Sequence, residues 1–97
     1  NPIMGTYTFL NGKKVKMWKV QLVSNDELKQ LQEKNNIDNI NSLTAGTVIL
    51  ASEKQGLFIK TIDGALSILE IQGENAKRMT TPEFLRGNKV EVIDKFE

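Results

Sequence analysis

Short stretches in which apolar and polar residues alternate, separated by turn-forming residues, run along most of the chain. Residues 6–10 are threonine, tyrosine, phenylalanine and leucine, a composition typical of a strand, and Asn11-Gly12 follows directly. Asparagine before glycine tolerates positive φ at both positions and is the strongest local signal for a tight hairpin. The pattern therefore predicts two strands, residues 6–10 and 13–23, joined by this turn.

The second predicted strand changes phase in its middle. Val15 and Met17 alternate with lysines, and after Trp18 the apolar positions fall one residue out of step. A β-bulge near Met17 and Trp18 accounts for the slip, because one extra residue keeps the same face inward. The bulge is predicted to place inward Val15, Met17 or Trp18, Val20 and Leu22, and outward Lys14, Lys16 and Lys19.

A short helix is predicted over residues 26–34, followed by a loop over residues 35–45. Ser24 and Glu27 have the spacing of a capping box, in which each side chain satisfies a backbone N–H at the start of the helix. Because only Leu28 and Leu31 form its apolar stripe, the helix is expected to lie on the surface.

The second half of the chain predicts an antiparallel meander and a second helix. Three strand patterns, residues 46–52, 57–62 and 65–72, are joined by a turn at residues 53–56 and a tight Asp63-Gly64 turn. A helix then begins at Thr80 or Thr81, with Pro82 suited to its first turn and Gly87 to its end. Residues 89–96 form a weak pattern for a closing strand. Five or six short strands with one or two small helices predict a mainly β domain, either a small barrel or a sandwich, and a partly open five-stranded barrel is the first choice.

Composition narrows the possible chemistry. The chain of 97 residues contains neither cysteine nor histidine, which excludes a disulfide framework and a thiolate metal site and removes the commonest general base. We therefore expect one domain, residues 1–97, with no catalytic residue, metal site or cofactor site of its own. The longest apolar runs are too short to cross a bilayer, and the start has no signal-peptide pattern, so a cytoplasmic location without membrane contact is expected. A first residue other than methionine suggests a fragment of a longer protein.

The charges are unevenly distributed, although the formal net charge is only +1. Residues 1–23 carry four lysines and no acid, residues 24–75 carry four lysines and eight acids, and residues 76–90 carry four basic residues and one acid. Two basic segments far apart in sequence could converge on one face. The lysines of residues 13–19 could track a nucleic-acid backbone, or they could form a solvated outer face that protects an edge strand.

Other candidate side chains have a structural interpretation beside the functional one. Lys77-Arg78 lies in a loop before a helix, where it could meet phosphates or remain a solvated loop. Trp18 and Tyr7 could stack on bases, but the alternation places them in the core, where the indole N–H would need a partner. Glu70, inside an apolar strand, is expected to pair with a basic residue or to face solvent. The glycines are too scattered for a phosphate-binding loop.

Six segments, in this order and spacing, are similar to those of the C-terminal domain of bacterial methionyl-tRNA formyltransferases. They are GTYTFLNGKKVKMWK (residues 5–19), AGTV (45–48), DGAL (63–66), LEIQ (69–72), KRM (77–79) and FLRG (84–87). Two features depart from the family's pattern: Ile3-Met4 stands where many members have Trp-Pro, and residues 24–45 form a longer connection. The resemblance implies an OB-like antiparallel β-barrel attached to a Rossmann-type catalytic domain that is absent from this chain and would use 10-formyltetrahydrofolate.

The resemblance also implies a role in translation initiation. A monomeric enzyme of this family, methionyl-tRNA formyltransferase, would use this domain to hold initiator methionyl-tRNA beside its own N-terminal catalytic domain. The basic residues of the matching motifs are the expected contacts: Lys13, Lys14, Lys16, Lys19, Lys77, Arg78, Arg86 and Lys89. The alternative is a structural or interaction domain of a sugar-nucleotide or formyltetrahydrofolate-using formyltransferase, without nucleic-acid contact. The tRNA hypothesis requires both basic segments to lie on the same side of the fold.

Overall fold

The described part of the chain is built mainly from strands. The computed structural model describes residues 6–10, 12–38, 40–91 and 96. Its strands are β1 (Thr6–Leu10), β2 (Lys13–Val23), β3 (Val48–Ser52), β4 (Gly56–Lys60), β5 (Ala65–Gly73) and β6 (Met79–Thr80). Its helices are α1 (Asn25–Asn35), a single 3₁₀ turn (Ile40–Ser42) and α2 (Thr81–Gly87). The five strands predicted within residues 6–72 and both predicted helices are present, with ends shifted by a few residues, and β6 was not predicted.

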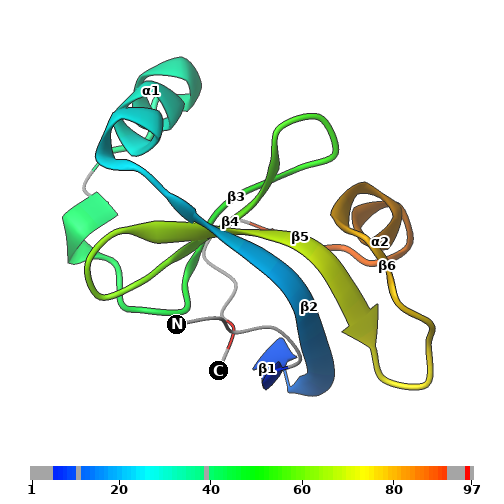
Figure 1. Ribbon diagram of the computed structural model, residues 1–97. Helices are drawn as coiled ribbons and strands as arrows, with labels where there is room; N and C mark the ends of the chain where they lie inside the picture. The colour runs from blue at the N-terminus through cyan, green and yellow to red at the C-terminus, as the bar shows by residue number, and fades with distance from the viewer. Residues whose placement is uncertain (1–5, 11, 39, 92–95, 97) are drawn as a thin grey trace.

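These strands pair in one strongly twisted antiparallel sheet with β5 near its centre (Figure 1). The order is β1-β2-β5-β4-β3, and β6 pairs with β5 beyond the start of β4. The predicted hairpin and the β3–β4–β5 meander are confirmed. The barrel expectation is met only in part, because no ladder joins β1 to β3 among the described residues. Phe96 is the residue near both edges: it forms an isolated bridge with Leu10 and donates its backbone N–H to the carbonyl of Gly46 at 2.8 Å.

The main core lies on the inner side of the curved sheet. Its most completely buried side chains come from β3, β4 and β5: Val48, Leu57, Ile68 and Ile71. Phe84 of α2 packs into the same cluster. Ile49 belongs to a second, smaller cluster with Ile40 and Ala65, against which Leu28 of α1 packs. The connection over residues 24–45 therefore covers one edge of the sheet and adds a small core of its own.

The predicted bulge in β2 is present, but the side chains around it are not placed as predicted. The ladder between β2 and β5 shifts register on both sides of Lys19. Val15 and Met17 are buried as expected, and the alternation runs unbroken through Trp18, so that the indole lies outside with Lys16. The assignment of Trp18 to the core is therefore wrong. The first register shift falls between Met17 and Lys19, at Trp18 itself, and the second falls between Lys19 and Val20.

Two further core assignments are wrong for a related reason. Tyr7 is 57% exposed, because it lies opposite Lys16 on the outer face of the β1–β2 hairpin. Leu22 is 73% exposed although its cross-strand neighbour Leu66 is buried. In the described residues β1 pairs only with Lys13–Met17 of β2, and the second half of β2 forms a free edge where an apolar side chain is poorly covered.

Both helices begin at the predicted caps. Ser24 accepts the backbone N–H of Glu27 at 3.1 Å and Glu27 accepts that of Ser24 at 3.3 Å, the reciprocal pair of a capping box. No described residue of α1 is buried, which confirms its predicted place on the surface. At α2 the cap is Thr80, whose backbone N–H and hydroxyl both donate to the Glu83 carboxylate at 3.1 Å. These two hydrogen bonds, with the positive charge of Arg86 nearby, lower the pKa of Glu83.

The end of the chain is described only in part. Half of the predicted closing strand, residues 92–95, lies outside the described residues. The described residues 89–91 do not form a strand, and Phe96 is buried. Gly46, which accepts the Phe96 N–H, has φ +94, and a Cβ there would lie 2.3 Å from the Phe96 carbonyl oxygen, so only glycine fits. Across the described ranges no helix is long and apolar enough to span a membrane.

Candidate nucleic-acid interface

The β1–β2 hairpin presents a row of cations on its outer face. Gly12 takes the positive φ (+85) that its turn requires, and Lys13 and Lys14 follow immediately on β2. The Nζ of Lys14 lies 4.4 Å and that of Lys16 lies 5.2 Å from the centre of the Tyr7 ring on β1. Ammonium groups at this distance are attracted to the negative face of an aromatic ring, a contact worth about 0.5–1 kcal/mol at an exposed site. Tyr7 therefore helps to orient two of the predicted lysines.

Trp18 extends this row toward the second basic segment. The Nζ of Lys16 lies 4.0 Å from the centre of the indole, and the guanidinium carbon of Arg78 lies 4.6 Å from it. Lys16 and Arg78 are sixty-two positions apart in the chain, yet they share one aromatic ring. The condition that the two basic segments meet on one side is satisfied for this pair.

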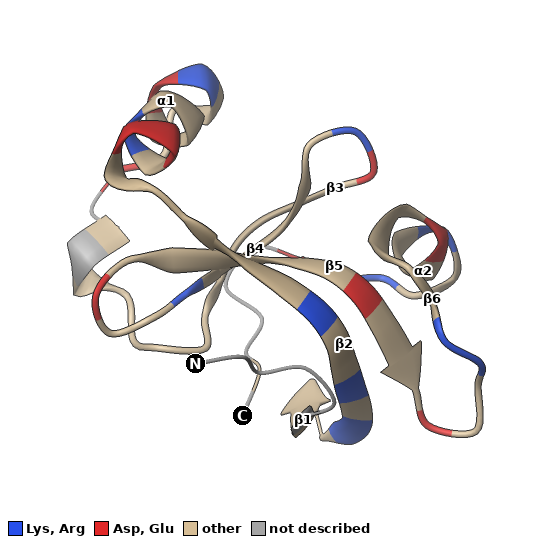
Figure 2. Cartoon of the chain, in the orientation of Figure 1, with Lys and Arg blue, Asp and Glu red and all other residues tan. Residues whose placement is uncertain are grey.

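The meeting follows from the sheet topology. β5 pairs with β2 along its length and with β6 near its end. The chain that leaves β5 therefore returns along the edge opposite β2, which places Lys77 and Arg78 across β5 from the lysines of β2. Figure 2 shows the basic residues of β2 on one side of β5 and those of the β5–β6 connection on the other. Glu70, the acidic residue of β5, lies between them and accepts from the Nε of Arg78 at 2.6 Å. The expectation that Glu70 pairs with a basic residue is confirmed.

A hollow beside this row is lined by residues of both basic segments. It has a volume of about 560 Å³ and lies between the start of β2, the β5–β6 connection and the end of α2. Lys13 and Lys14 line it from one side and Lys89 from another, with Glu74 also on its wall. The hollow is open to solvent and could accept one or two phosphate groups. Its three lysines outnumber its single carboxylate, so its net charge favours an anion.

Three of the eight predicted contacts form ion pairs with carboxylates, and one of these three, Arg86, is directed away from this region. Arg86 donates to Glu53 of the β3–β4 turn at 3.1 Å, which directs it toward that turn. Lys89 lies 3.4 Å from Glu91, and Arg78 is held by Glu70. The other five form no ion pair with a described carboxylate: Lys13, Lys14, Lys16, Lys19 and Lys77. Because the three pairs are at least partly exposed, each contributes little and could exchange its carboxylate for a phosphate.

The aromatic members of this surface are the residues that sequence reasoning misses. The core assignment of Trp18 and Tyr7 follows from the rule that apolar residues lie inside, although the lysines at positions 14 and 16 already mark the outer side of the strand. If the alternation of inward and outward residues is continued from Met17 to the next position, Trp18 falls on the outer face. The predicted need for an indole partner is confirmed, since Trp18 Nε1 donates to Gln72 Oε1 at 2.8 Å.

The chemical groups on this surface suit the binding of an anion. Within the described ranges, no group of three or more acidic side chains is placed to hold a metal ion. What the surface provides is a line of cations at fixed positions, backed by aromatic rings and flanked by a polar hollow. Such a surface suits a polyanion whose charges are regularly spaced, as in a nucleic-acid backbone.

Comparison with known proteins agrees with the resemblance found in the sequence. Residues 1–89 match the family described as "Formyl transferase, C-terminal domain". The methionyl-tRNA formyltransferase of Carboxydothermus hydrogenoformans is 32% identical over 97 residues, covering 100% of this chain and 27% of that protein. That of Clostridioides difficile is 38% identical over 92 residues, covering 95% of this chain and 25% of that protein. The chain thus spans about a quarter of the length of these curated relatives.

Proposed function

The chain belongs to the formyl transferase C-terminal domain family, and we propose that it is the part of a methionyl-tRNA formyltransferase that holds the tRNA. In this proposal the domain binds the sugar-phosphate backbone of initiator methionyl-tRNA, and the rest of the protein binds 10-formyltetrahydrofolate and transfers the formyl group. The domain contributes affinity and orientation, and the chemistry takes place elsewhere. The relatives that cover the chain from end to end carry that enzyme's name, which supports this choice over other formyltransferases.

One observation carries the proposal: Lys16 of the first basic segment and Arg78 of the second lie over the same indole ring. Two basic segments that faced opposite sides could not contact one stretch of backbone. Around this pair, Lys13, Lys14 and Lys77 are exposed and form no ion pair with a described acid. Binding a phosphate to such a group releases condensed counterions from the nucleic acid, which is the main source of sequence-independent affinity.

The fold supports the same proposal. We infer that the sheet curls into the OB-like barrel of its family, with Phe96 linking β1 to the start of β3 through Leu10 and Gly46. OB folds present one curved strand face to nucleic acid, and in this proposal the row on β1 and β2 belongs to that face. In this assignment the interface consists of Lys13, Lys14, Lys16, Lys19, Lys77 and Arg78, with Lys89 at its border. Arg86 is left out, because it is directed to Glu53.

The salt dependence of binding tests this proposal. The full-length protein is titrated with initiator tRNA at several salt concentrations, and the logarithm of affinity is plotted against the logarithm of salt. Each phosphate contact is expected to add roughly 0.7–0.9 to the magnitude of the slope, so a surface with several contacts should give a steep negative line. Substituting Lys77 and Arg78 with alanine should lower the magnitude by about two.

A slope near zero would contradict the proposal. It would favour the alternative function, a structural or interaction domain of a formyltransferase that acts on another substrate. A steep slope that is unchanged when Lys77 and Arg78 are replaced would show that tRNA binds elsewhere in the protein and that this surface takes no part.

A further inference from the structure

Two side chains outside the set of cations connect β2 to the loop that carries the second basic segment. Trp18 Nε1 donates to Gln72 Oε1 at 2.8 Å, across the β2–β5 ladder. Gln72 Nε2 then donates to the backbone carbonyl of Ala76 at 2.7 Å, inside the β5–β6 connection. An amide side chain that accepts at its oxygen and donates at its nitrogen is fixed at both ends. The chain of hydrogen bonds therefore runs from β2 through β5 to the loop at residues 74–78.

The first part of this loop, residues 74–76, has few other hydrogen bonds among the described residues. It makes a tight turn in which Ala76 donates its N–H to the carbonyl of Gly73 at 3.2 Å and Asn75 adopts a left-handed backbone conformation with φ 61. Glu74, Asn75 and Ala76 are exposed, so none of these three side chains anchors the turn in the core. The Gln72 amide donates a side-chain hydrogen bond from β5 to the backbone of this turn. Lys77 and Arg78 follow immediately.

The indole ring of Trp18 also contacts two cations, Lys16 and Arg78. Arg78 lies over it at 4.6 Å while its Nε is held by Glu70 at 2.6 Å, so the guanidinium has two partners that fix its direction. Lys16 lies over the ring at 4.0 Å. A long exposed side chain loses rotamer freedom when it binds, at a cost of about 0.5–1.5 kcal/mol per side chain, and prior ordering removes part of that cost.

We propose that Trp18 and Gln72 are positioning residues of the tRNA interface, which act by holding the segment of Lys77 and Arg78 at a fixed position relative to β2. This inference rests on the proposed function. It adds an account of how the two basic segments are held at fixed positions relative to each other. Trp18 supplies a hydrogen-bond donor to Gln72 and a ring surface to Arg78, and Gln72 fixes the turn. Neither residue needs to touch the nucleic acid.

Direct stacking of Trp18 on an unpaired base is the main alternative. Bases do stack on exposed aromatic residues in single-strand binding proteins. Here the ring already lies against Lys16 and Arg78, and a base would have to displace one of them. The surroundings of Trp18 therefore favour positioning, and the two roles differ in whether the effect of a Trp18 substitution passes through Arg78.

A double-mutant cycle in the full-length protein distinguishes them. Trp18→Phe keeps an aromatic ring and removes the donor, and Gln72→Met keeps the length of the side chain and removes both hydrogen bonds. Gln21→Met is the matched control, because Gln21 lies exposed on the same strand pair, opposite Ser67. Each is combined with the wild-type loop and with Lys77→Ala/Arg78→Ala, and affinity for initiator tRNA is measured at one salt concentration together with the thermal unfolding midpoint.

We expect Trp18→Phe and Gln72→Met each to weaken binding about two- to tenfold with the wild-type loop and to have no effect when Lys77 and Arg78 are alanine. Gln21→Met should have no effect in either background. Losses of equal size in both backgrounds would overturn the inference and favour direct stacking or a general effect on the fold, which the unfolding midpoint separates. No loss in either background, with Lys77→Ala/Arg78→Ala still weakening binding, would overturn the inference and leave the proposed function intact. If Lys77→Ala/Arg78→Ala itself has no effect, the proposed interface fails and the inference with it.

Discussion

Replacing Lys14 and Lys16 together with glutamate is expected to weaken tRNA binding by about a hundredfold or more. Both lysines lie over Tyr7 on the outer face of the hairpin, and neither forms an ion pair with a described carboxylate. A hydrogen bond to a charged group contributes about 1.5–3 kcal/mol, so removing two such hydrogen bonds together corresponds to roughly a hundredfold or more in affinity. The new carboxylates would also repel the phosphates. Affinity measured at fixed salt gives the result.

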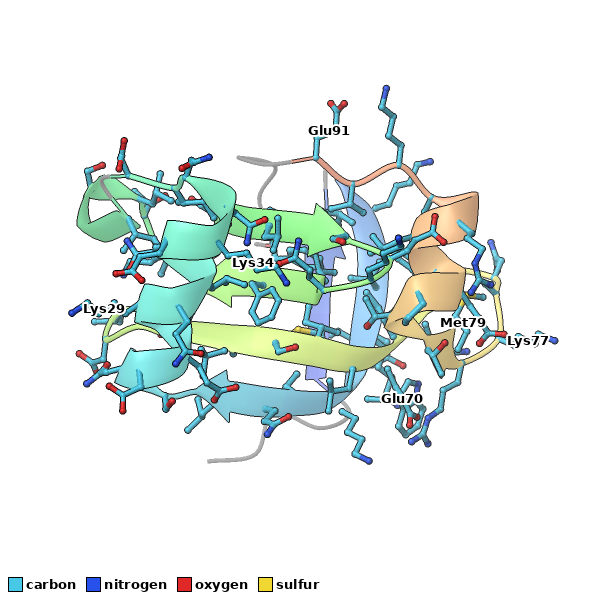
Figure 3. The ribbon with its side chains drawn as sticks, turned by 90° about the horizontal axis from the view of Figure 1, so that it is seen from above. Lys29, Lys34, Glu70, Lys77, Met79 and Glu91 are labelled. Carbon is cyan, nitrogen blue, oxygen red and sulfur yellow. The ribbon has the colours of Figure 1, made fainter. Side chains whose placement is uncertain are left out.

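The matched control reverses two lysines of α1, with the same change in net charge. Figure 3 shows Lys29 at the end of the molecule opposite Lys77, with Lys34 between them and Glu70 on the side of Lys77. At physiological salt, charges farther apart than about 8 Å are largely screened, so Lys29→Glu/Lys34→Glu should change affinity only slightly. Equal losses for the two double variants would mean that binding follows net charge alone. That outcome would remove the reason for placing the interface on β2.

Replacing Ile71 with alanine is expected to destabilise the domain by about 2–5 kcal/mol. Ile71 is fully buried in β5 and lies opposite Met17 of β2 on one side and Met79 of β6 on the other. The cavity would open beneath the point where the two basic segments meet. Since a whole domain is stabilised by only about 5–15 kcal/mol, this is a large fraction of the total.

Hydrogen exchange in the full-length protein measures this effect where it occurs. The amides of β2 and β5 should exchange faster in Ile71→Ala, by the factor that corresponds to the lost free energy. Ile71→Val is the matched control, because it removes one methyl group and should cost about 0.5–1.5 kcal/mol. If alanine and valine give the same small change, Ile71 does not have the central place in the core that its burial and its two strand partners indicate.

The parts of the fold that depend on local signals were predictable from the sequence. The capping box of Ser24 and Glu27 and the turn at Gly12 are recognised from residue types at fixed spacing, and each is satisfied by atoms within a few residues. The three-strand meander follows for the same reason. Periodicity also located the bulge in β2, because every residue after it changed face.

Features that depend on distant pairing were not predictable in the same way. Whether Trp18 faces inward depends on which side of it the bulge falls, and β5 determines that through its register with β2. The pairing of Arg86 with Glu53 joins α2 to a turn thirty-three positions earlier, and no local pattern links the two. The two-residue strand β6 is too short to have a pattern of its own. The candidate site was therefore predicted as a set of charges but not as an arrangement.

The reactivity of individual lysines in the presence of initiator tRNA tests the central claim most directly, because the chain carries lysines both on the proposed interface and away from it. Amine labelling of the full-length protein, followed by mass spectrometry, compares free and tRNA-bound states. Protection is predicted for Lys13, Lys14, Lys16, Lys19 and Lys77, with unchanged labelling of Lys29, Lys34 and Lys54. Protection confined to the lysines of α1, or to only one of the two basic segments, would contradict the claim that both segments form a single tRNA-binding face.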